Sequence, residues 1–275
     1  MEPIVDFHCH VYPEKIAAHA AAAVASFYRA ETAGVKPANL TGTPEVLLRE
    51  EDRAGIAYQV IHSVATTPHQ VGSVNGFLFR LASQAGGRLI PFGTLHPDCA
   101  DPGREVEEIL SMGMKGVKLH PDMQGFAINE PRSFRLLEAC ENRLIVLYHT
   151  GDDRYHFSNP EELIPALKAF PNTTFVGAHM GGYTIWEQAA RALAGEFSNL
   201  YVDISSTMFA LPPEKVRELV RAYGADRVLF GTDFPMWRPK EELDRFYSLG
   251  LSCEEERKIL YGNGAKLLGL PKDTE

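Results

Sequence analysis

Two histidines near the start of the chain are the first residues whose spacing could support chemistry. His8 and His10 lie in the segment VDFHCH, residues 5–10, which has the apolar character of a β-strand. Side chains two residues apart on a strand face the same side, at a separation of about 6.5–7 Å along the backbone. The two imidazoles can therefore lean toward one ion. Cys9 must face the other way, toward covering helices, and we assign it no role.

Other metal-binding residue types stand at the ends of later apolar segments. Zinc binds histidine nitrogens and carboxylate oxygens at about 2.0–2.2 Å, and a catalytic zinc site leaves one position open for water. A lone strand-end histidine, such as His62 or His96, is more typical of a hydrogen-bonded structural residue. The combination is what indicates a metal: besides His8 and His10, the chain offers His149 at the end of 144–149, His179 at the end of 174–179 and Asp233 after 228–232. His120, after 114–119, is a further residue of a type that can bind metal.

Eight short apolar or β-branched segments predict the strands that must position these residues. They cover residues 4–9, 58–64, 89–95, 114–119, 144–149, 174–179, 200–205 and 228–232. Segments with helical spacing lie between them: 43–55 begins with Thr43 as N-cap, 159–171 begins with Asn159, and 11–57 has room for two helices. This alternation predicts a (β/α)8 TIM barrel, with a doubly wound open sheet as the alternative. The barrel is favoured because its strand ends converge on one mouth.

Composition narrows the possible classes of protein. The 275 residues, 45% of them apolar, are expected to form a single domain over 1–275. The net charge of −9 and the absence of a basic run argue against nucleic acid as a partner. Four scattered cysteines without a CxxC pair fit reduced thiols. No stretch reads as a membrane span or signal peptide, so a cytoplasmic protein without a membrane partner is expected.

The motifs together resemble the amidohydrolase superfamily, in particular its amidohydrolase-related branch, which also contains the aminocarboxymuconate-semialdehyde decarboxylase-like enzymes. The segments that carry the resemblance are DFHCH, GVKLHP, YHTG, AHMGG, GTDFP and GNGAKLLGL, spread over essentially the whole chain. The resemblance implies a (β/α)8 barrel and one or two divalent metal ions, most often Zn²⁺. It also makes a homodimer possible.

The resemblance implies a role for each matching residue. His8, His10 and His149 would bind metal. Asp233 would bind metal and also handle the proton of the attacking water. His179 would either bind a second metal or stay unligated and polarise the substrate.

Some candidate residues remain open between two roles. In two-metal members of the superfamily, a carboxylated lysine or a glutamate at the end of strand 4 bridges the ions. Lys118 and His120 stand there, although Lys118 could instead be an ammonium that binds a substrate carboxylate or pairs with a barrel acid. Arg154 could grip a carboxylate and Trp237 could wall a flat ring, or both could be ordinary loop residues.

Three functions are compatible with this set of residues. The leading hypothesis is metal-dependent hydrolysis of a small amide, ester or lactone by an activated water. The alternative is a lyase that decarboxylates or hydrates a small, unsaturated or aromatic carboxylic acid. A metal-binding or ligand-sensing barrel without catalysis is the third, and the presence of Asp233 and His179 argues against it.

Overall fold

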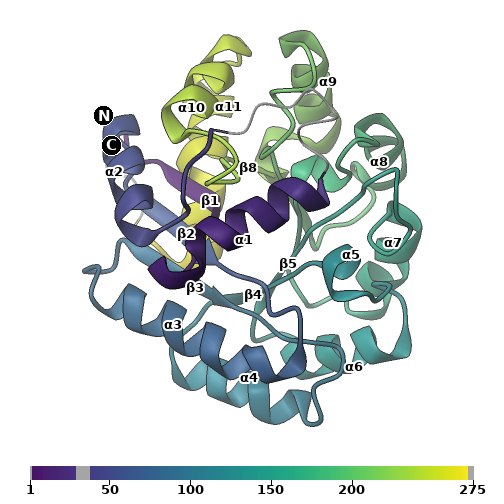
Figure 1. Ribbon diagram of the computed structural model, residues 1–275. Coiled ribbons are helices and arrows are strands. Elements are labelled where there is room, and N and C mark those ends of the chain that lie inside the picture. Colours follow the sequence, from purple (N-terminus) through teal and green to yellow (C-terminus); the bar gives the residue numbers. More distant parts are fainter. Residues whose placement is uncertain (1, 29–37, 272–275) are drawn as a thin grey trace.

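The computed structural model describes residues 2–28 and 38–271, and within them eight parallel strands form one sheet. Each strand pairs with the next along the chain, in the order β1 to β8 (Figure 1). The strands are β1 (Val5–His10), β2 (Tyr58–His62), β3 (Leu89–Gly93), β4 (Gly116–Leu119), β5 (Ile145–Tyr148), β6 (Phe175–Gly177), β7 (Leu200–Asp203) and β8 (Val228–Leu229). The (β/α)8 barrel predicted from the sequence is therefore confirmed.

Helices alternate with the strands and cover the barrel. The longer ones are α1 (Glu14–Phe27), α2 (Pro44–Ala54), α3 (Val71–Ser83), α4 (Pro102–Ser111), α6 (Pro131–Cys140), α7 (Pro160–Ala169), α8 (Trp186–Leu193), α9 (Pro213–Tyr223) and α10 (Pro239–Ser248). The shorter ones are α5 (Pro121–Gln124), α11 (Cys253–Arg257) and α12 (Asn263–Leu268), with a π-helical turn, η4 (Lys258–Gly262), between the last two. The two helices expected within 11–57 are present as α1 and α2; residues 29–37 of that segment lie outside the described residues.

The predicted helix starts are partly right. The Thr43 hydroxyl accepts a hydrogen bond from the backbone N–H of Val46 at 3.4 Å, as an N-cap does. Asn159 occupies the N-cap position of α7, but its side chain caps nothing. Its Nδ2 instead donates to the carbonyl of Tyr155 at 3.2 Å, because the preceding loop turns back over it.

The barrel closes along a seam between β1 and the residues that follow β8. Cys9 of β1 forms a parallel bridge with Phe234, which follows β8. Three hydrogen bonds define the seam: Phe7 N to Phe230 O at 2.9 Å, Asp233 N to His8 O at 2.9 Å, and His10 N to Phe234 O at 2.7 Å.

A buried carboxylate fastens this seam. Asp6 is fully buried, and its Oδ1 accepts hydrogen bonds at 3.0 Å from the backbone N–H groups of His8 and Thr232. The Thr232 hydroxyl donates a further, short hydrogen bond to Oδ2. The first and the last strand are therefore tied together through one side chain.

A β-bulge in β1 decides which way its side chains point. The pairing with β2 shifts between Asp6, opposite Gln59, and Cys9, opposite Ile61, so β1 holds one extra residue there. Phe7 packs inside the barrel against Phe92, with ring centroids 5.6 Å apart, and the adjacent His8 also faces inward. Cys9 faces α2, as predicted: its sulfur lies 3.9 Å from a carboxylate oxygen of Glu51.

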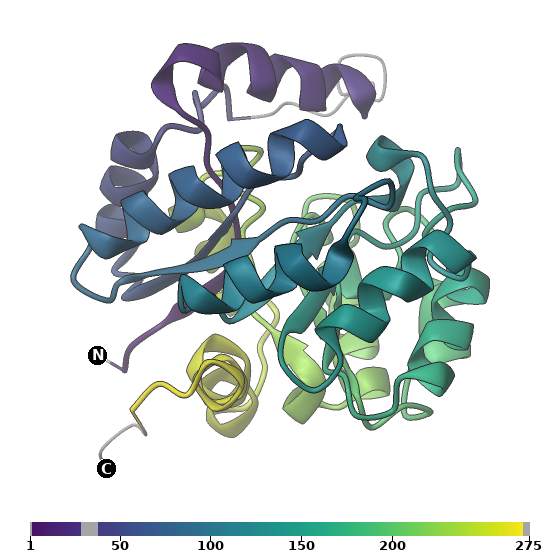
Figure 2. The ribbon, with the colours of Figure 1, turned by 90° about the horizontal axis from the view of Figure 1, so that it is seen from below.

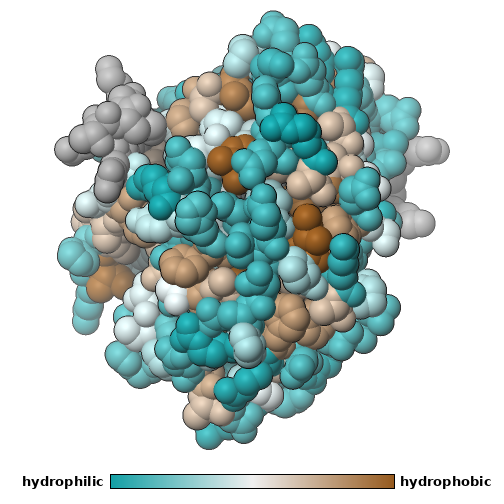
Figure 3. Space-filling model, turned by 90° about the vertical axis from the view of Figure 1, so that its right-hand side faces the viewer, coloured by the Kyte–Doolittle hydropathy of each residue, from teal (hydrophilic) through white to brown (hydrophobic). Residues whose placement is uncertain are grey.

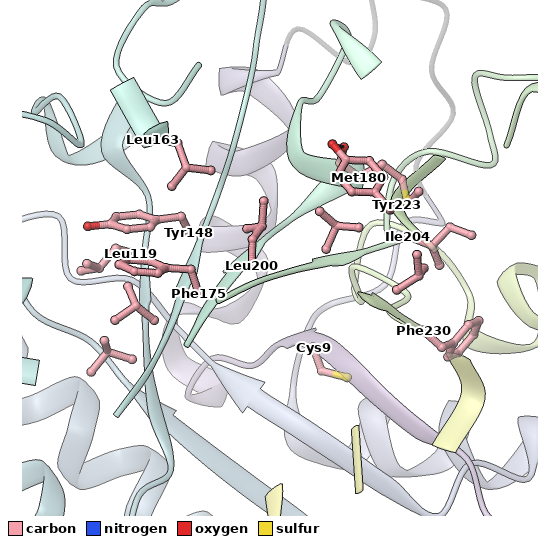
Figure 4. Close-up of a cluster of buried hydrophobic side chains, with 14 of the residues drawn as sticks. Cys9, Leu119, Tyr148, Leu163, Phe175, Met180, Leu200, Ile204, Tyr223 and Phe230 are labelled. Carbon is pink, nitrogen blue, oxygen red and sulfur yellow. Dashed lines mark hydrogen bonds between the residues drawn. The ribbon is translucent and has the colours of Figure 1, made fainter. Parts of the chain in front are cut away.

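The hydrophobic core has two layers. The larger lies between the strands and the surrounding helices, where side chains such as Tyr148, Phe175 and Leu163 pack together (Figure 4). The smaller fills the barrel interior below the histidines and includes Phe7 and Leu147. On the outside, the face seen in Figure 3 is mostly hydrophilic, with scattered apolar residues, as expected of solvent-facing helices.

Helix α1 is the exception to this tight packing. It lies across one end of the barrel beside α3, while both chain termini lie on the side away from it (Figure 2). Among its fourteen residues only Ala17 is buried. None of the helices in the described residues is both long and apolar enough to cross a bilayer.

We predict that the change Thr232→Val weakens the seam. It removes the hydroxyl that donates to Asp6 and accepts from the Phe234 N–H at 3.2 Å, while it leaves the side-chain volume nearly unchanged. The free energy of unfolding, measured by urea denaturation, should fall by about 1–3 kcal/mol.

Thr173→Val is the matched control, because the buried hydroxyl of Thr173 has no hydrogen-bond partner among the described residues. Its replacement should be neutral or stabilising. Equal losses in the two variants would contradict the role given to Thr232.

Candidate metal centre

Three side chains of the β1–β8 seam bring their donor atoms together. His8 Nε2 lies 3.2 Å from His10 Nε2 and 3.4 Å from Asp233 Oδ1, and His10 Nε2 lies 3.3 Å from the same oxygen. Four ligands placed tetrahedrally at about 2.1 Å from one zinc ion are about 3.4 Å apart. The spacing of this triad, which we define as His8, His10 and Asp233, therefore fits the ligands of a single cation.

Hydrogen bonds fix which nitrogen of His8 carries the proton. Its Nδ1 lies 2.9 Å from Asp203 Oδ2, an acceptor, so Nδ1 holds the hydrogen and Nε2 presents a lone pair to the triad. Histidines that bind metal through one nitrogen usually donate a hydrogen bond from the other, as His8 does to Asp203, and this bond fixes the orientation of the ring.

His179 is held in the same tautomer. Its Nδ1 lies 3.1 Å from the backbone oxygen of Ser205, while the Ser205 hydroxyl donates to Asp203. Nδ1 therefore carries the hydrogen, and the lone pair of His179 Nε2 points at His149 Nδ1, 3.0 Å away. His179 Nε2 is therefore unprotonated, which is the state that a metal ligand requires.

His149, His120 and Tyr28 form a second group of rings, between His179 and the end of β4. His149 stacks on His120, with centroids 4.0 Å apart and planes 7° from parallel. The Tyr28 hydroxyl, at the end of α1, lies 2.6 Å from His120 Nε2 and 3.2 Å from His149 Nδ1. His149 is connected to the triad through His179, whose ring centroid is 5.2 Å from that of His8.

The pKa values of the side chains at this site favour the protonation states of metal ligands. Burial lowers the pKa of His8 to about 4, and burial together with the neighbouring His120 and His179 places the pKa of His149 well below its usual value. Burial opposes the ionisation of Asp233, but His8, a hydrogen bond with His10 and His179 bring its pKa below the usual range. Neutral imidazoles and an ionised carboxylate are the protonation states that metal binding requires.

Three residues at this site have an unusual backbone conformation. His179, Ser206 and Asp233 have φ angles of 57°, 45° and 59°, in the left-handed region that residues with a Cβ rarely adopt. Each such residue costs about 1–3 kcal/mol and is typical of functional sites. The turns after β6, β7 and β8 are thus strained where they present these side chains.

Asp233 is supported on the side away from the triad. The Ser206 hydroxyl donates to its Oδ2 at 2.5 Å and accepts from Trp237 Nε1 at 2.8 Å. The Trp237 ring stacks on Phe209, with centroids 4.6 Å apart, and lines a small pocket next to Asp233. Trp237 therefore positions Asp233 through Ser206, and its contact with a substrate ring stays a prediction.

Lys118 is buried beside the triad. Its Nζ lies 3.4 Å from His8 Nε2, and burial lowers its pKa to about 8 against the pull of Asp203 and Asp233. The side chain therefore faces the metal centre, as both of its predicted roles require. Whether it is carboxylated stays a prediction.

Arg154 lies elsewhere. Its Nε donates to Asp152 Oδ1 at 2.8 Å, and its Nη1 donates to the backbone oxygen of Phe27 at 2.6 Å, so it anchors the end of α1. It does not line the large cavity described next. That Arg154 binds a substrate carboxylate stays a prediction.

A cavity of about 890 Å³ opens onto the cluster. This volume lies within the usual range for small-molecule sites. The predicted site residues that share it are His8, His10, Lys118, His120, His149, His179 and Asp233.

Two residues that contact these side chains, Asp203 and Tyr28, were not predicted from the sequence, and a third, His62, was expected to be a hydrogen-bonded structural residue. Asp203 ends β7 and could have been found as an acid closing a predicted strand. Tyr28 gives no signal, because nothing in the sequence says where the end of α1 lies. His62 is fully buried against His10, with ring centroids 4.4 Å apart, and neither ring nitrogen has a hydrogen-bond partner among the described residues.

We predict that Asp203→Asn weakens metal binding. The amide removes the charge that holds the Nδ1 proton of His8, so metal affinity should fall about 10- to 100-fold. Competition with a chromogenic chelator measures this. Asp226→Asn, at an exposed carboxylate paired with Lys258, is the control and should leave the affinity unchanged. Unaltered affinity in Asp203→Asn would refute the orienting role.

Solved structures of other proteins share this architecture. An uncharacterized TIM-barrel protein from Bordetella bronchiseptica is 24% identical, with a TM-score of 0.78 over 97% of this chain and 98% of that one. A 2,6-dihydroxybenzoate decarboxylase complexed with 2,6-dihydroxybenzoate is 17% identical, with a TM-score of 0.71 over 98% and 100%. A dihydroxybenzoic acid decarboxylase from a Polaromonas species, with bound manganese and the inhibitor 2-nitroresorcinol, is 17% identical, with a TM-score of 0.69 over 98% and 97%.

The sequence itself identifies the family. A family model described as Amidohydrolase (Amidohydro_2) matches residues 5–270, which include β1 with its two histidines and the helices after β8. The match covers far more than half of the chain and confirms the resemblance read from the motifs. The chain belongs to the amidohydrolase family.

Proposed function

We propose that this protein is a metal-dependent hydrolase in which His8, His10 and Asp233 hold a divalent cation. The mutual separations of 3.2–3.4 Å between their donor atoms carry the proposal. His149 and His179, with their nitrogens turned toward each other, would supply the remaining ligands. The His and Asp donor set suits zinc, and it also suits manganese or iron.

The chain's own residues divide the work of hydrolysis. When bound, a divalent cation lowers the pKa of a coordinated water from 15.7 to about 7. Asp233 accepts the proton of the attacking water at Oδ2, because Oδ1 is the oxygen turned toward the histidine nitrogens of the triad, and then delivers the proton to the leaving group. Lys118, as an ammonium at the inner end of the cavity, stabilises negative charge that develops on the substrate.

We predict that Asp233→Asn separates metal binding from turnover. The amide oxygen can still face the cation, so much of the metal should remain, but the group can no longer accept a proton. Turnover of any ester, lactone or amide found active in a screen should fall about 10²- to 10⁴-fold.

Metal content by atomic emission and initial rates are measured on the same samples, with Asp226→Asn as the control. Activity close to that of the parent protein would exclude Asp233 as the proton acceptor. Full loss of activity after chelation, restored by added metal, is expected of the parent protein.

Decarboxylation is the second candidate function. Lys118 next to the triad could hold the carboxylate of a small aromatic acid near the cation, and two of the similar folds carry the names of decarboxylases. Neither observation depends on an activated water.

The product distinguishes the two reactions. In H₂¹⁸O, a hydrolase incorporates ¹⁸O into the acid product, whereas a decarboxylase releases CO₂ and places a solvent proton on carbon. With a panel of esters, lactones and dihydroxybenzoates we expect ¹⁸O incorporation. Metal-dependent CO₂ release without it would replace hydrolysis by decarboxylation.

A further inference from the structure

The large cavity extends well beyond the metal centre. From the histidines it continues between α1 and α3, where its lining includes Ala21 and Val24 of α1 and Val74 and Phe77 of α3, with the polar Arg80 of α3 also at the lining. The first four of these side chains are apolar and half-buried. One continuous space therefore joins a polar, charged inner end to an apolar outer slot, which we define by these four residues.

The composition of α1 explains why the slot is open. Positions 17, 21, 24 and 28 recur at helical spacing and share the inner face of the helix. Ala17 is itself buried, whereas alanine at position 21 is too short to fill the space beneath it and lines the cavity. A helix with leucines at these positions would close the slot.

The slot nevertheless has fixed walls. At its far end α1 is held by Arg154, which donates to the Phe27 carbonyl, and by the Tyr28 hydroxyl on His120. The opposite wall, α3, is packed onto the barrel through Val71 and Leu78. Thus α1 lies above α3 without being packed into it (Figure 2).

The size of the space bears on the substrate. An apolar cavity of about 150 Å³ already holds benzene, and this one measures about 890 Å³. A single-ring acid bound at the metal centre would leave the slot filled only with water against apolar walls, which is unfavourable.

From this geometry we infer that the substrate carries an extended apolar group, an alkyl chain or a second ring, which lies between α1 and α3 while its reacting carbonyl or carboxylate lies at the metal centre. The inference rests on the proposed metal-dependent function for the position of the reacting group. It names the substrate class: small acids, esters or amides with a long apolar substituent.

The test uses 4-alkylbenzoates from methyl to hexyl as probes, with binding to the metal-loaded protein measured by calorimetry. Each methylene that enters the slot should tighten binding about fourfold. Ala21→Trp should fill the slot and abolish this gain, while binding of unsubstituted benzoate is kept. Ser26→Trp adds the same bulk to the exposed side of α1, outside the cavity, and should behave as the parent protein.

The outcomes separate this inference from the proposed function. Affinity that does not change with chain length, or an equal effect of both tryptophans, would overturn the inference even if benzoate binding needs the metal. A gain with chain length that Ala21→Trp removes supports it. If the gain is found but benzoate itself binds equally well with and without metal, the slot is retained and the metal-dependent function is contradicted.

Discussion

The site depends on the seam between β1 and the residues that follow β8. Asp6 and Thr232 are 226 positions apart, yet the buried carboxylate of one accepts both the N–H and the hydroxyl of the other. This seam places His8 and His10 directly beside Asp233. Without it the three donor atoms would belong to opposite edges of an open sheet, and no ion could contact all of them.

The same region contains several features that lower the stability of the fold, and the rest of the barrel must offset them. Imidazole rings are packed with their nitrogens 3.0–3.2 Å apart, the amino group of Lys118 is buried beside them, and three residues adopt left-handed backbone angles. Each feature destabilises the fold in the absence of a cation. The two packed layers of apolar side chains supply the stability that allows such a centre to persist.

Much of this arrangement could be predicted from the sequence, because strand periodicity and the order of polar residues at strand ends are local signals. The eight strands, the inward direction of His8 and His10, and the outward direction of Cys9 follow from alternation. The bulge that lets Phe7 and His8 both face inward does not, since it depends on register with β2. The roles of Asp203, Tyr28 and Arg154 come from contacts between distant segments, which no spacing along the chain reveals.

The order in which the chain is made gives the seam a further consequence. Strand β1 leaves the ribosome before the other strands of the sheet, and its partner across the seam, the residues after β8, is made only after them. Until then β1 has one edge without a partner, and such edges favour aggregation. A cation held by all three residues of the triad could therefore bind only after the residues that follow β8 have been made.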